Sequence, residues 1–274
     1  MGAADSTLPL TRESILALLE TRALGRTLHL HAQLDSTNDE AHRLAEAGAA
    51  HGTLVIAEAQ TRGRGRRGRS WTTPPGTALA MSLVLRPALA AARAPELSFA
   101  AALAVCESAR ALGAAGAQVK WPNDVQCDGR KLSGILAELR TSGPRLSHLV
   151  LGIGLNVNVA LEELPLELRP LASSLRIESG APVSRARACA TLLAALEGWL
   201  ELHARDGFSP LRARWRELSC TLGRRVRVEG ERPLSGLAVD LAEDGALLLR
   251  SADGALHRVS AGDVEHLRED RPAR

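Results

Sequence analysis

Arginine and glycine alternate in one short segment, Gly63–Trp71, which reads Gly-Arg-Gly-Arg-Arg-Gly-Arg-Ser-Trp. A guanidinium can bind a phosphate or a carboxylate through two parallel hydrogen bonds, and this segment carries four of them within six residues: Arg64, Arg66, Arg67 and Arg69. Its glycines allow the backbone to approach a ligand closely. The segment predicts a loop that binds small anions. The alternatives are a solvated basic loop and a patch that binds nucleic acid.

The same segment matches two phosphate-binding motifs in outline. Gly63, Gly65 and Gly68 have the GxGxxG spacing, and Gly68-Arg69-Ser70 resembles the end of a P-loop with arginine in place of lysine. Both motifs require the loop to open a helix whose N-terminus binds the phosphate. Here Thr-Thr-Pro-Pro follows Trp71 and cannot form the first turns of a helix. Both motifs are therefore excluded.

Lysine occurs only twice, at Lys120 and Lys131, so nearly all of the 34 basic residues are arginines. A lysine in a sequence that otherwise uses arginine indicates a position that needs a compact point charge. Lys120 opens the segment Lys-Trp-Pro-Asn-Asp, and an Asp-Gly hairpin turn folds Lys131 back towards it. We expect Asn123, Asp124 and Lys131 to face one pocket, in which Lys131 offers a cation to an oxyanion. For Asp124 three roles stay open: binding magnesium, acting as a base, or capping the turn.

The elements that must position these residues follow from apolar spacing and turn residues. Helices are expected at residues 12–24, 37–47, 96–112, 184–204 and 210–218, and strands at 53–60, 77–85, 118–121, 131–139 and 148–157. Thr37 and Glu40 have the spacing of a capping box at a helix start. Short β segments follow at residues 225–229, 236–241, 246–250 and 255–259. They predict a domain boundary near residue 220 and a small β-barrel after it.

Composition excludes several classes of protein. The chain has 274 residues, 45% of them hydrophobic, and a net charge of +3, which suits one ordinary domain plus a smaller one. A disordered chain and a nucleic-acid protein driven by bulk charge are both excluded. No apolar run is long enough to span a membrane. The four cysteines and eight histidines form no metal-binding pattern. Widely spaced cysteines predict reduced thiols in the cytoplasm.

Together these segments resemble the biotin–protein ligases, also called biotin–acetyl-CoA-carboxylase synthetases. The resemblance extends from about residue 30 to about residue 268. Its matching parts follow the family's order: residues 36–38, 60–71, 120–124, 131–138, 152–158 and the β-rich tail. The combination of an Arg/Gly loop ending in tryptophan with Lys-Trp-Pro-Asn-Asp and Lys-Leu-Ser-Gly-Ile-Leu is highly specific.

The resemblance implies an α+β fold, with a mixed-sheet catalytic domain over residues 10–218 and an SH3-like β-barrel over residues 221–270. It also implies a two-step reaction with ATP and Mg²⁺ as cofactors. The carboxylate of biotin attacks the α-phosphate of ATP to give biotinyl-5′-AMP and pyrophosphate. The biotinyl group then passes to a lysine of a biotin carboxyl carrier protein. The residue types fit this chemistry, because two unit anions about 4 Å apart repel by ~4 kcal/mol at an effective dielectric of 20 and need cations between them.

Position by position, the resemblance implies three overlapping sets of site residues. Biotin binding falls to Ser36, Thr37, Asn38, Gln60, Gly63, Arg64, Gly65, Arg66, Trp71, Lys131 and Gly134. ATP binding falls to Arg64, Arg66, Arg67, Arg69, Lys120, Asn123, Asp124, Lys131 and Asn156. Catalysis falls to Lys131, Arg66 and Asp124, and magnesium is held through the phosphates, with Asp124 as its candidate side-chain ligand. Ser36 and Thr37 could instead be helix caps, and Asn156 a strand-end residue.

Repressor-type members of the family carry an N-terminal helix-turn-helix domain of about 60 residues. Only 35 residues precede Ser36, so we expect a ligase that binds neither DNA nor membranes, and a homodimer is left open. The runner-up is a lipoate or octanoate ligase, which shares the acyl chemistry but resembles RRxSGGG in its loop. An Arg-loop nucleic-acid module is the alternative from another class, and salt-sensitive oligonucleotide binding would reveal it.

Overall fold

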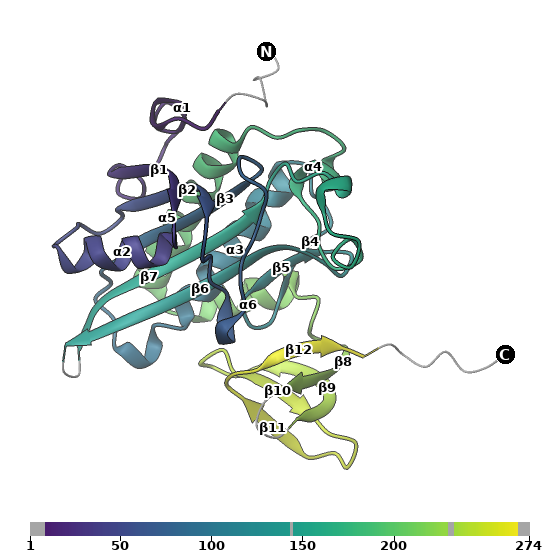
Figure 1. The fold of residues 1–274 in the computed structure, drawn as a ribbon. Coiled ribbons are helices and arrows are strands. Elements are labelled where there is room, and N and C mark those ends of the chain that lie inside the picture. Colours follow the sequence, from purple (N-terminus) through teal and green to yellow (C-terminus); the bar gives the residue numbers. More distant parts are fainter. Residues whose placement is uncertain (1–8, 143–144, 230–232, 268–274) are drawn as a thin grey trace.

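The computed structural model describes residues 9–142, 145–229 and 233–267, which form two sheets with helices packed on the larger one (Figure 1). The first part of the chain contains six helices: α1 Arg12–Leu16, α2 Thr37–Glu46, α3 Glu96–Ala111, α4 Leu175–Ser179, α5 Arg185–Asp206 and α6 Ser209–Leu218. Its strands are β1 Leu28–Leu34, β2 Leu54–Gln60, β3 Ala78–Leu85, β4 Ala117–Lys120, β5 Asp124–Cys127, β6 Arg130–Ser142 and β7 Arg145–Asn156. The second sheet comprises β8 Arg225–Glu229, β9 Leu234–Leu241, β10 Leu247–Arg250, β11 Leu256–Val259 and β12 Asp263–His266.

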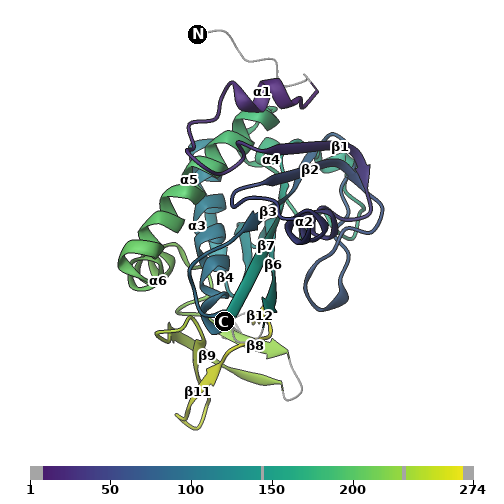
Figure 2. The same ribbon diagram turned by 90° about the vertical axis from the view of Figure 1, so that its left-hand side faces the viewer.

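The large sheet is mixed and has seven strands in the order β1-β2-β3-β7-β6-β5-β4. Only β1 and β2 run parallel, and each of the other neighbours is antiparallel. Helix α2 covers one face of this sheet, whereas α3 and α5 lie on the other (Figure 2). A mixed sheet between helices, joined to a separate antiparallel sheet, confirms the expected α+β class.

Strand β3 shows how the two faces differ, because successive side chains of a strand point to opposite sides. Leu79, Met81 and Leu83 belong to the main apolar core that the sheet shares with α3 and α5. On the other face Val84 packs in a small cluster under α2, and Ser82 is buried and polar. The α2 face therefore has room for a polar site that the core face does not offer.

The C-terminal sheet is antiparallel, in the order β11-β10-β9-β8-β12. Trp121, at the end of β4, ties it to the large sheet. The side chain of Trp121 is 2% exposed, and its indole Nε1 donates a hydrogen bond of 3.0 Å to the carbonyl of Gly245. Its backbone N–H donates to the hydroxyl of Thr221 at 3.0 Å. The C-terminal sheet is thus anchored next to the Lys-Trp-Pro-Asn-Asp turn.

Two expectations about local structure are wrong. The helix predicted over residues 12–24 ends at Leu16, and further along the chain the backbone N–H groups of Ala23 and Leu24 donate to the Glu197 carboxylate. Helix α2 does begin at Thr37, but its N-cap is Ser36 and the predicted capping box is absent. The hydroxyl of Thr37 bonds elsewhere, as described below.

Three strands were not predicted from the sequence: β1, β5 and β12. The other strands fall close to the expected ranges, and the Asp128-Gly129 turn joins β5 to β6 as expected, with both residues at positive φ. Among the described residues, every helix is too short or too polar to cross a lipid bilayer.

Candidate active site

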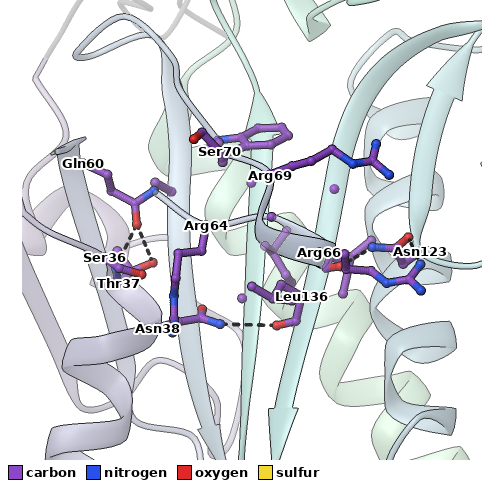
Figure 3. A pocket seen from close by; sticks show the side chains of 18 of the residues that line it. Ser36, Thr37, Asn38, Gln60, Arg64, Arg66, Arg69, Ser70, Asn123 and Leu136 are labelled. Atoms are coloured by element: carbon purple, nitrogen blue, oxygen red, sulfur yellow. Dashed lines mark hydrogen bonds between the residues drawn. The ribbon is translucent and has the colours of Figure 1, made fainter. Parts of the chain in front are cut away.

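A pocket opens on the α2 face of the large sheet, below the Arg/Gly loop (Figure 3). Its lining comes from the first turn of α2, the end of β2, the loop, β3, the β4–β5 turn with the start of β6, the end of β7 and Asp263 of β12. Most of the predicted site residues are among its lining: Ser36, Thr37, Asn38, Gln60, Arg64, Gly65, Arg66, Arg69, Trp71, Asn123, Asp124, Lys131 and Gly134. The fold therefore brings together side chains that are up to about a hundred residues apart in the sequence.

Glycines form the floor of this pocket. Gly134 on β6 pairs with Gly154 on β7, and Gly152 lies two residues earlier on the same face. A methyl group on Gly154 would come within 2.4 Å of the Trp71 ring, so this ring lies flat against the bare strand. A methyl group on Gly152 would come within 2.2 Å of Asn38 Oδ1. The missing side chains thus leave the space that Trp71 and Asn38 occupy.

One end of the pocket is polar and uncharged. Gln60 Oε1 accepts hydrogen bonds from the backbone N–H of Thr37 at 2.8 Å and from its hydroxyl at 3.2 Å. The hydroxyl of Ser82 lies 2.8 Å from Thr37 Oγ1 and 2.6 Å from Asn38 Oδ1. Thr37 is only 4% exposed and Asn38 likewise. These fixed amides and hydroxyls can present hydrogen-bonding groups to a neutral polar ring.

The other end is positively charged. Lys131 Nζ lies 2.8 Å from Asp124 Oδ1 and 5.9 Å from the centre of the Trp71 ring. Arg66 Nη1 donates to Asn123 Oδ1 at 2.9 Å. Burial lowers the pKa of the Arg66 guanidinium, and the charge of Asp124 is among the effects that oppose this. Since an arginine stays protonated in a protein, the pocket holds two cations beside an indole ring.

The Arg/Gly loop is closed on itself and is held from the C-terminal sheet. Within the loop, the N–H of Gly65 donates to the carbonyl of Arg69 at 2.6 Å, and Arg67 adopts a left-handed conformation with φ of 55°. From β12, the Asp263 carboxylate forms ion pairs with Arg69 and, at 3.4 Å, with Arg67 Nη1. Asp263 also lines the pocket. Two of the four loop guanidiniums are thereby directed towards a residue of the other sheet.

Four predicted site residues lie outside the lining of this pocket: Gly63, Arg67, Lys120 and Asn156. A methyl group on Gly63 would come within 2.2 Å of the Trp71 carbonyl, so this glycine permits the loop to close. Asn156 Nδ2 donates to the carbonyl of Ser173 at 2.9 Å, while its buried Oδ1 has no hydrogen-bond partner among the described residues. Lys120 ends β4 opposite Asp124, and its charge helps to lower the pKa of His266.

Sequence reasoning missed five residues of this region: Ser82, Glu138, Gly152, Gly154 and Asp263. The Gly-Ile-Gly spacing at residues 152–154 was a usable signal, because two glycines two apart on a strand leave one face bare. The sequence around Ser82, Glu138 and Asp263 shows no comparable pattern. Their roles depend on strand pairing and on contacts between distant segments. No cluster of three or more metal-binding side chains occurs within residues 9–142, 145–229 and 233–267.

A polar end, an aromatic wall and a cationic end suit an elongated ligand that carries a polar group at one end and a negative charge at the other. The profile of the biotin/lipoate A/B protein ligase family matches residues 30–156, and that of the biotin protein ligase C-terminal domain matches residues 221–267. The biotin–[acetyl-CoA-carboxylase] ligase of Mycobacterium tuberculosis is 40% identical over 250 residues, which cover 89% of this chain and 90% of the relative. The bifunctional ligase/repressor BirA of Bacillus subtilis is 34% identical over 90% of this chain and 76% of its own length.

Solved structures agree with these sequence matches. The biotin protein ligase of Aquifex aeolicus in complex with biotin and ATP superimposes with a TM-score of 0.76 at 28% identity, covering 89% of this chain and 99% of the other. The chain therefore belongs to the biotin/lipoate A/B protein ligase family, among the biotin–protein ligases, as its sequence motifs predicted.

Proposed function

We propose that this protein activates biotin with ATP to biotinyl-5′-AMP and transfers the biotinyl group to a specific lysine of a biotin carboxyl carrier protein. The observation that carries the proposal is the order of groups along one pocket. Thr37 and Gln60 lie at an uncharged polar end, the Trp71 ring forms an apolar wall, and Arg66 and Lys131 lie at a cationic end. Biotin has the matching order of a ureido ring, an apolar chain and a carboxylate.

At the polar end, Ser36, Thr37, Asn38 and Gln60 hold the ureido ring. The bond from Thr37 to Gln60 fixes the amide of Gln60, so that its NH₂ group remains to donate to a ligand. Polar groups that are fixed in this way discriminate strongly, because a ligand without matching groups leaves them unpaired. Backbone near Gly63 and Gly65 closes over the ring.

At the cationic end, Lys131 and Arg66 receive the biotin carboxylate and the α-phosphate. Because two unit anions about 4 Å apart repel by ~4 kcal/mol at an effective dielectric of 20, the reaction needs cations between them. Gly134 leaves room beside the amine, since a methyl group there would come within 3.2 Å of Lys131 Nζ. The carboxylate of Asp124 keeps the ammonium of Lys131 in place through an ion pair of 2.8 Å.

The outer phosphates fall to Arg67 and Arg69, on the rim formed by the loop, and Arg64 was predicted to share in this role. Asn123 and Asp124 face the nucleotide. Magnesium characteristically takes one or two carboxylates and completes its shell with phosphates and water. The carboxylate of Asp124 fits that donor set, whereas the other carboxylate of the pocket, Asp263, is paired with Arg67 and Arg69; when bound, the ion would supply charge neutralisation of the triphosphate.

Two further residues, Asn156 and Lys120, are proposed to contact ATP. The buried and unpaired Oδ1 of Asn156 is an acceptor that a nucleotide could satisfy. Lys120 adds a positive charge behind Asp124, its partner in the β4–β5 pair.

The reaction has two steps, adenylation of biotin and transfer of the biotinyl group. A carboxylate oxygen of biotin forms a bond to the α-phosphorus, and the bond to the β-phosphate oxygen breaks to release pyrophosphate. The uncharged amine of the acceptor lysine then attacks the acyl carbon. The bond from that carbon to the bridging oxygen breaks, so AMP leaves with this oxygen, and the nitrogen releases one proton to solvent as the amide forms. Closure of the Arg/Gly loop excludes water, which would otherwise hydrolyse the mixed anhydride.

The carrier protein has a place to approach. A groove of about 1120 Å³ runs from the Arg/Gly loop past Pro122 to Gly245 of the C-terminal sheet. It borders Arg66 and Asn123, so a lysine inserted from this side could reach the acyl-adenylate. We propose that the C-terminal sheet helps to dock the carrier there.

The chain also divides into two domains in this proposal. We propose a catalytic domain at residues 10–218 and a C-terminal domain at 221–270, of which residues 268–270 lie outside the described residues.

The four cysteines are free and buried, and burial raises the pKa of Cys189 to about 12. Unpaired thiols suit the reducing cytoplasm, which is where we place the enzyme. Dimer formation stays open to measurement.

Biotin-dependent exchange of labelled pyrophosphate into ATP tests the proposal. The wild-type protein should catalyse this exchange with biotin, and should not do so with lipoate or octanoate. Lys131→Ala should reduce the exchange rate at least a hundredfold, as expected of a charge that stabilises developing anions, with the melting temperature little changed. Exchange at the wild-type rate in Lys131→Ala would refute the role of Lys131. Absence of exchange in the wild-type protein, with salt-sensitive binding to a generic oligonucleotide, would favour the nucleic-acid alternative.

A further inference from the structure

One carboxylate outside the pocket holds two residues that line it. Glu138 Oε2 accepts a hydrogen bond from Asn38 Nδ2 at 2.7 Å and from Arg64 Nη2 at 2.8 Å. Asn38 belongs to the first turn of α2, and Arg64 belongs to the Arg/Gly loop. Glu138 therefore joins the helix that carries the polar end of the pocket to the loop that covers it.

The position of Glu138 follows from the period of β6. Gly134 and Leu136 line the pocket, and Glu138 is the next residue on the same face of the strand. Its side chain is 25% exposed, whereas that of Asp39, the other carboxylate on Arg64, is 54% exposed. Since solvent weakens an ion pair, Glu138 is the stronger of the two partners of Arg64.

The amide of Asn38 is fixed from both sides. Its Oδ1 lies 2.6 Å from the Ser82 hydroxyl, and its NH₂ group faces Glu138. Gly152 leaves the space that this amide needs. By contrast, the side chain of Arg64 is 40% exposed to solvent. The carboxylate thus connects a rigid residue to a loop residue that solvent surrounds on one side.

We propose that Glu138 is a positioning residue that latches the Arg/Gly loop onto α2 and so sets the closed loop over biotin, an inference that rests on the proposed function. Arg64 then acts through this latch, and its guanidinium is directed at carboxylates of the protein in place of phosphate. The latch couples the ureido end of the pocket to loop closure. Glu138 touches no reacting atom, so its loss weakens biotin binding and leaves the chemical steps largely intact.

Glu138→Gln tests the latch with little change in volume. The amide oxygen of glutamine can still accept from Asn38 and Arg64, but the negative charge that strengthens the contact with Arg64 is lost, so the loop should open more often. We expect the dissociation constant of biotin, measured by calorimetry without ATP, to rise about tenfold, which is the ratio for one charge-assisted hydrogen bond of ~1.4 kcal/mol. The KM for biotin should rise by a similar factor, with kcat within about threefold of wild type. Trypsin should cleave the loop after its arginines several times faster.

Glu40→Gln is the matched control, because the Glu40 side chain, 15% exposed, also pairs with one arginine, Arg43, and neither residue lines the pocket. It should leave the biotin dissociation constant and the rate of loop cleavage at wild-type values. Unchanged loop cleavage and biotin affinity in Glu138→Gln would overturn the inference. So would a tenfold fall in kcat at unchanged KM, because that result assigns Glu138 to the chemical step.

A second variant keeps the test valid if Glu138→Gln folds poorly. Arg64→Gln breaks the same contact from the loop, and the double variant should bind biotin no more weakly than the weaker single variant. A rise equal to the product of the two single effects would show that no latch joins them. If wild-type protein fails to bind biotin at all, the proposed function fails, whereas the trypsin comparison still tests the latch by itself.

Discussion

Substitution of Gly154 by alanine tests whether the bare floor of the pocket positions the Trp71 wall. The new methyl carbon would lie 2.4 Å from Cε2, 2.6 Å from Cζ2 and 2.8 Å from Cδ2 of Trp71. Carbon atoms pack about 3.5–4.0 Å apart, so the ring must retreat by roughly 1 Å or more into the space for the ligand. Overpacking of this kind costs about 1–3 kcal/mol. We therefore expect the dissociation constant of biotin to rise by a factor of about 10 to 100.

Two further glycines give a graded series. A methyl group on Gly134 would come within 3.2 Å of Lys131 Nζ, the mobile end of a long side chain, so Gly134→Ala should have a smaller effect than Gly154→Ala. Gly116 lies in a turn with no atom within 4 Å of the new methyl group, which makes Gly116→Ala the control for folding.

Calorimetric titration with biotin, together with the melting temperature of each variant, checks this series. The expected order of biotin affinity is Gly116→Ala equal to wild type, then Gly134→Ala, then Gly154→Ala. Wild-type affinity in Gly154→Ala would refute the assignment of Trp71 as a wall of the biotin pocket. Equal losses in all three variants would point to a general loss of stability.

Two further predictions concern the contact between the sheets. Trp121→Phe removes the hydrogen bond to the Gly245 carbonyl and leaves that buried acceptor unpaired, so the free energy of unfolding in urea should fall by about 1–3 kcal/mol; an unchanged midpoint would contradict this. Burial, followed by the charges of Lys120 and Arg224, lowers the pKa of His266 from 6.5 to about 4. Between these pH values the unfolded chain binds a proton at this histidine and the folded chain does not. The contribution of His266 to the free energy of unfolding is therefore fully present above pH 6.5. It is lost as the pH falls towards 4, by up to about 3 kcal/mol. Urea titrations at pH 7.5 and 4.5 should show this loss in the wild type and a smaller one in His266→Asn, and equal losses would contradict it.

Part of the pocket could be predicted from residue types and spacing. They indicated that Asn123, Asp124 and Lys131 share one pocket. The arginine loop kept three interpretations, and the family resemblance supplied the expectation that Arg66 meets Lys131 there. The Asp-Gly turn also predicted correctly that Lys131 folds back towards Asp124. The strands rich in valine, leucine and isoleucine were found because they are buried on both faces.

The errors have physical causes that lie outside each local segment. Strand β1 is an edge strand with half-buried polar residues, so its alternation is weak. Helix α1 ends at Leu16, and in the last part of the predicted helix the N–H groups of Ala23 and Leu24 donate to Glu197, far along the chain. The hydroxyl of Thr37 bonds to Gln60 in place of its own helix end. Such competition between local and tertiary hydrogen bonds becomes visible only when the strands are paired.

The ion pairs between Asp263 and the arginine loop also affect when activity can arise during biosynthesis. A ribosome releases the loop early, whereas β12 emerges almost two hundred residues later, and domains fold in that order. Until the final strand is in place, Arg67 and Arg69 lack the counter-charge that directs them. A growing or truncated chain would therefore hold the pocket of the large sheet without the ion pairs that tie Arg67 and Arg69 to the C-terminal sheet.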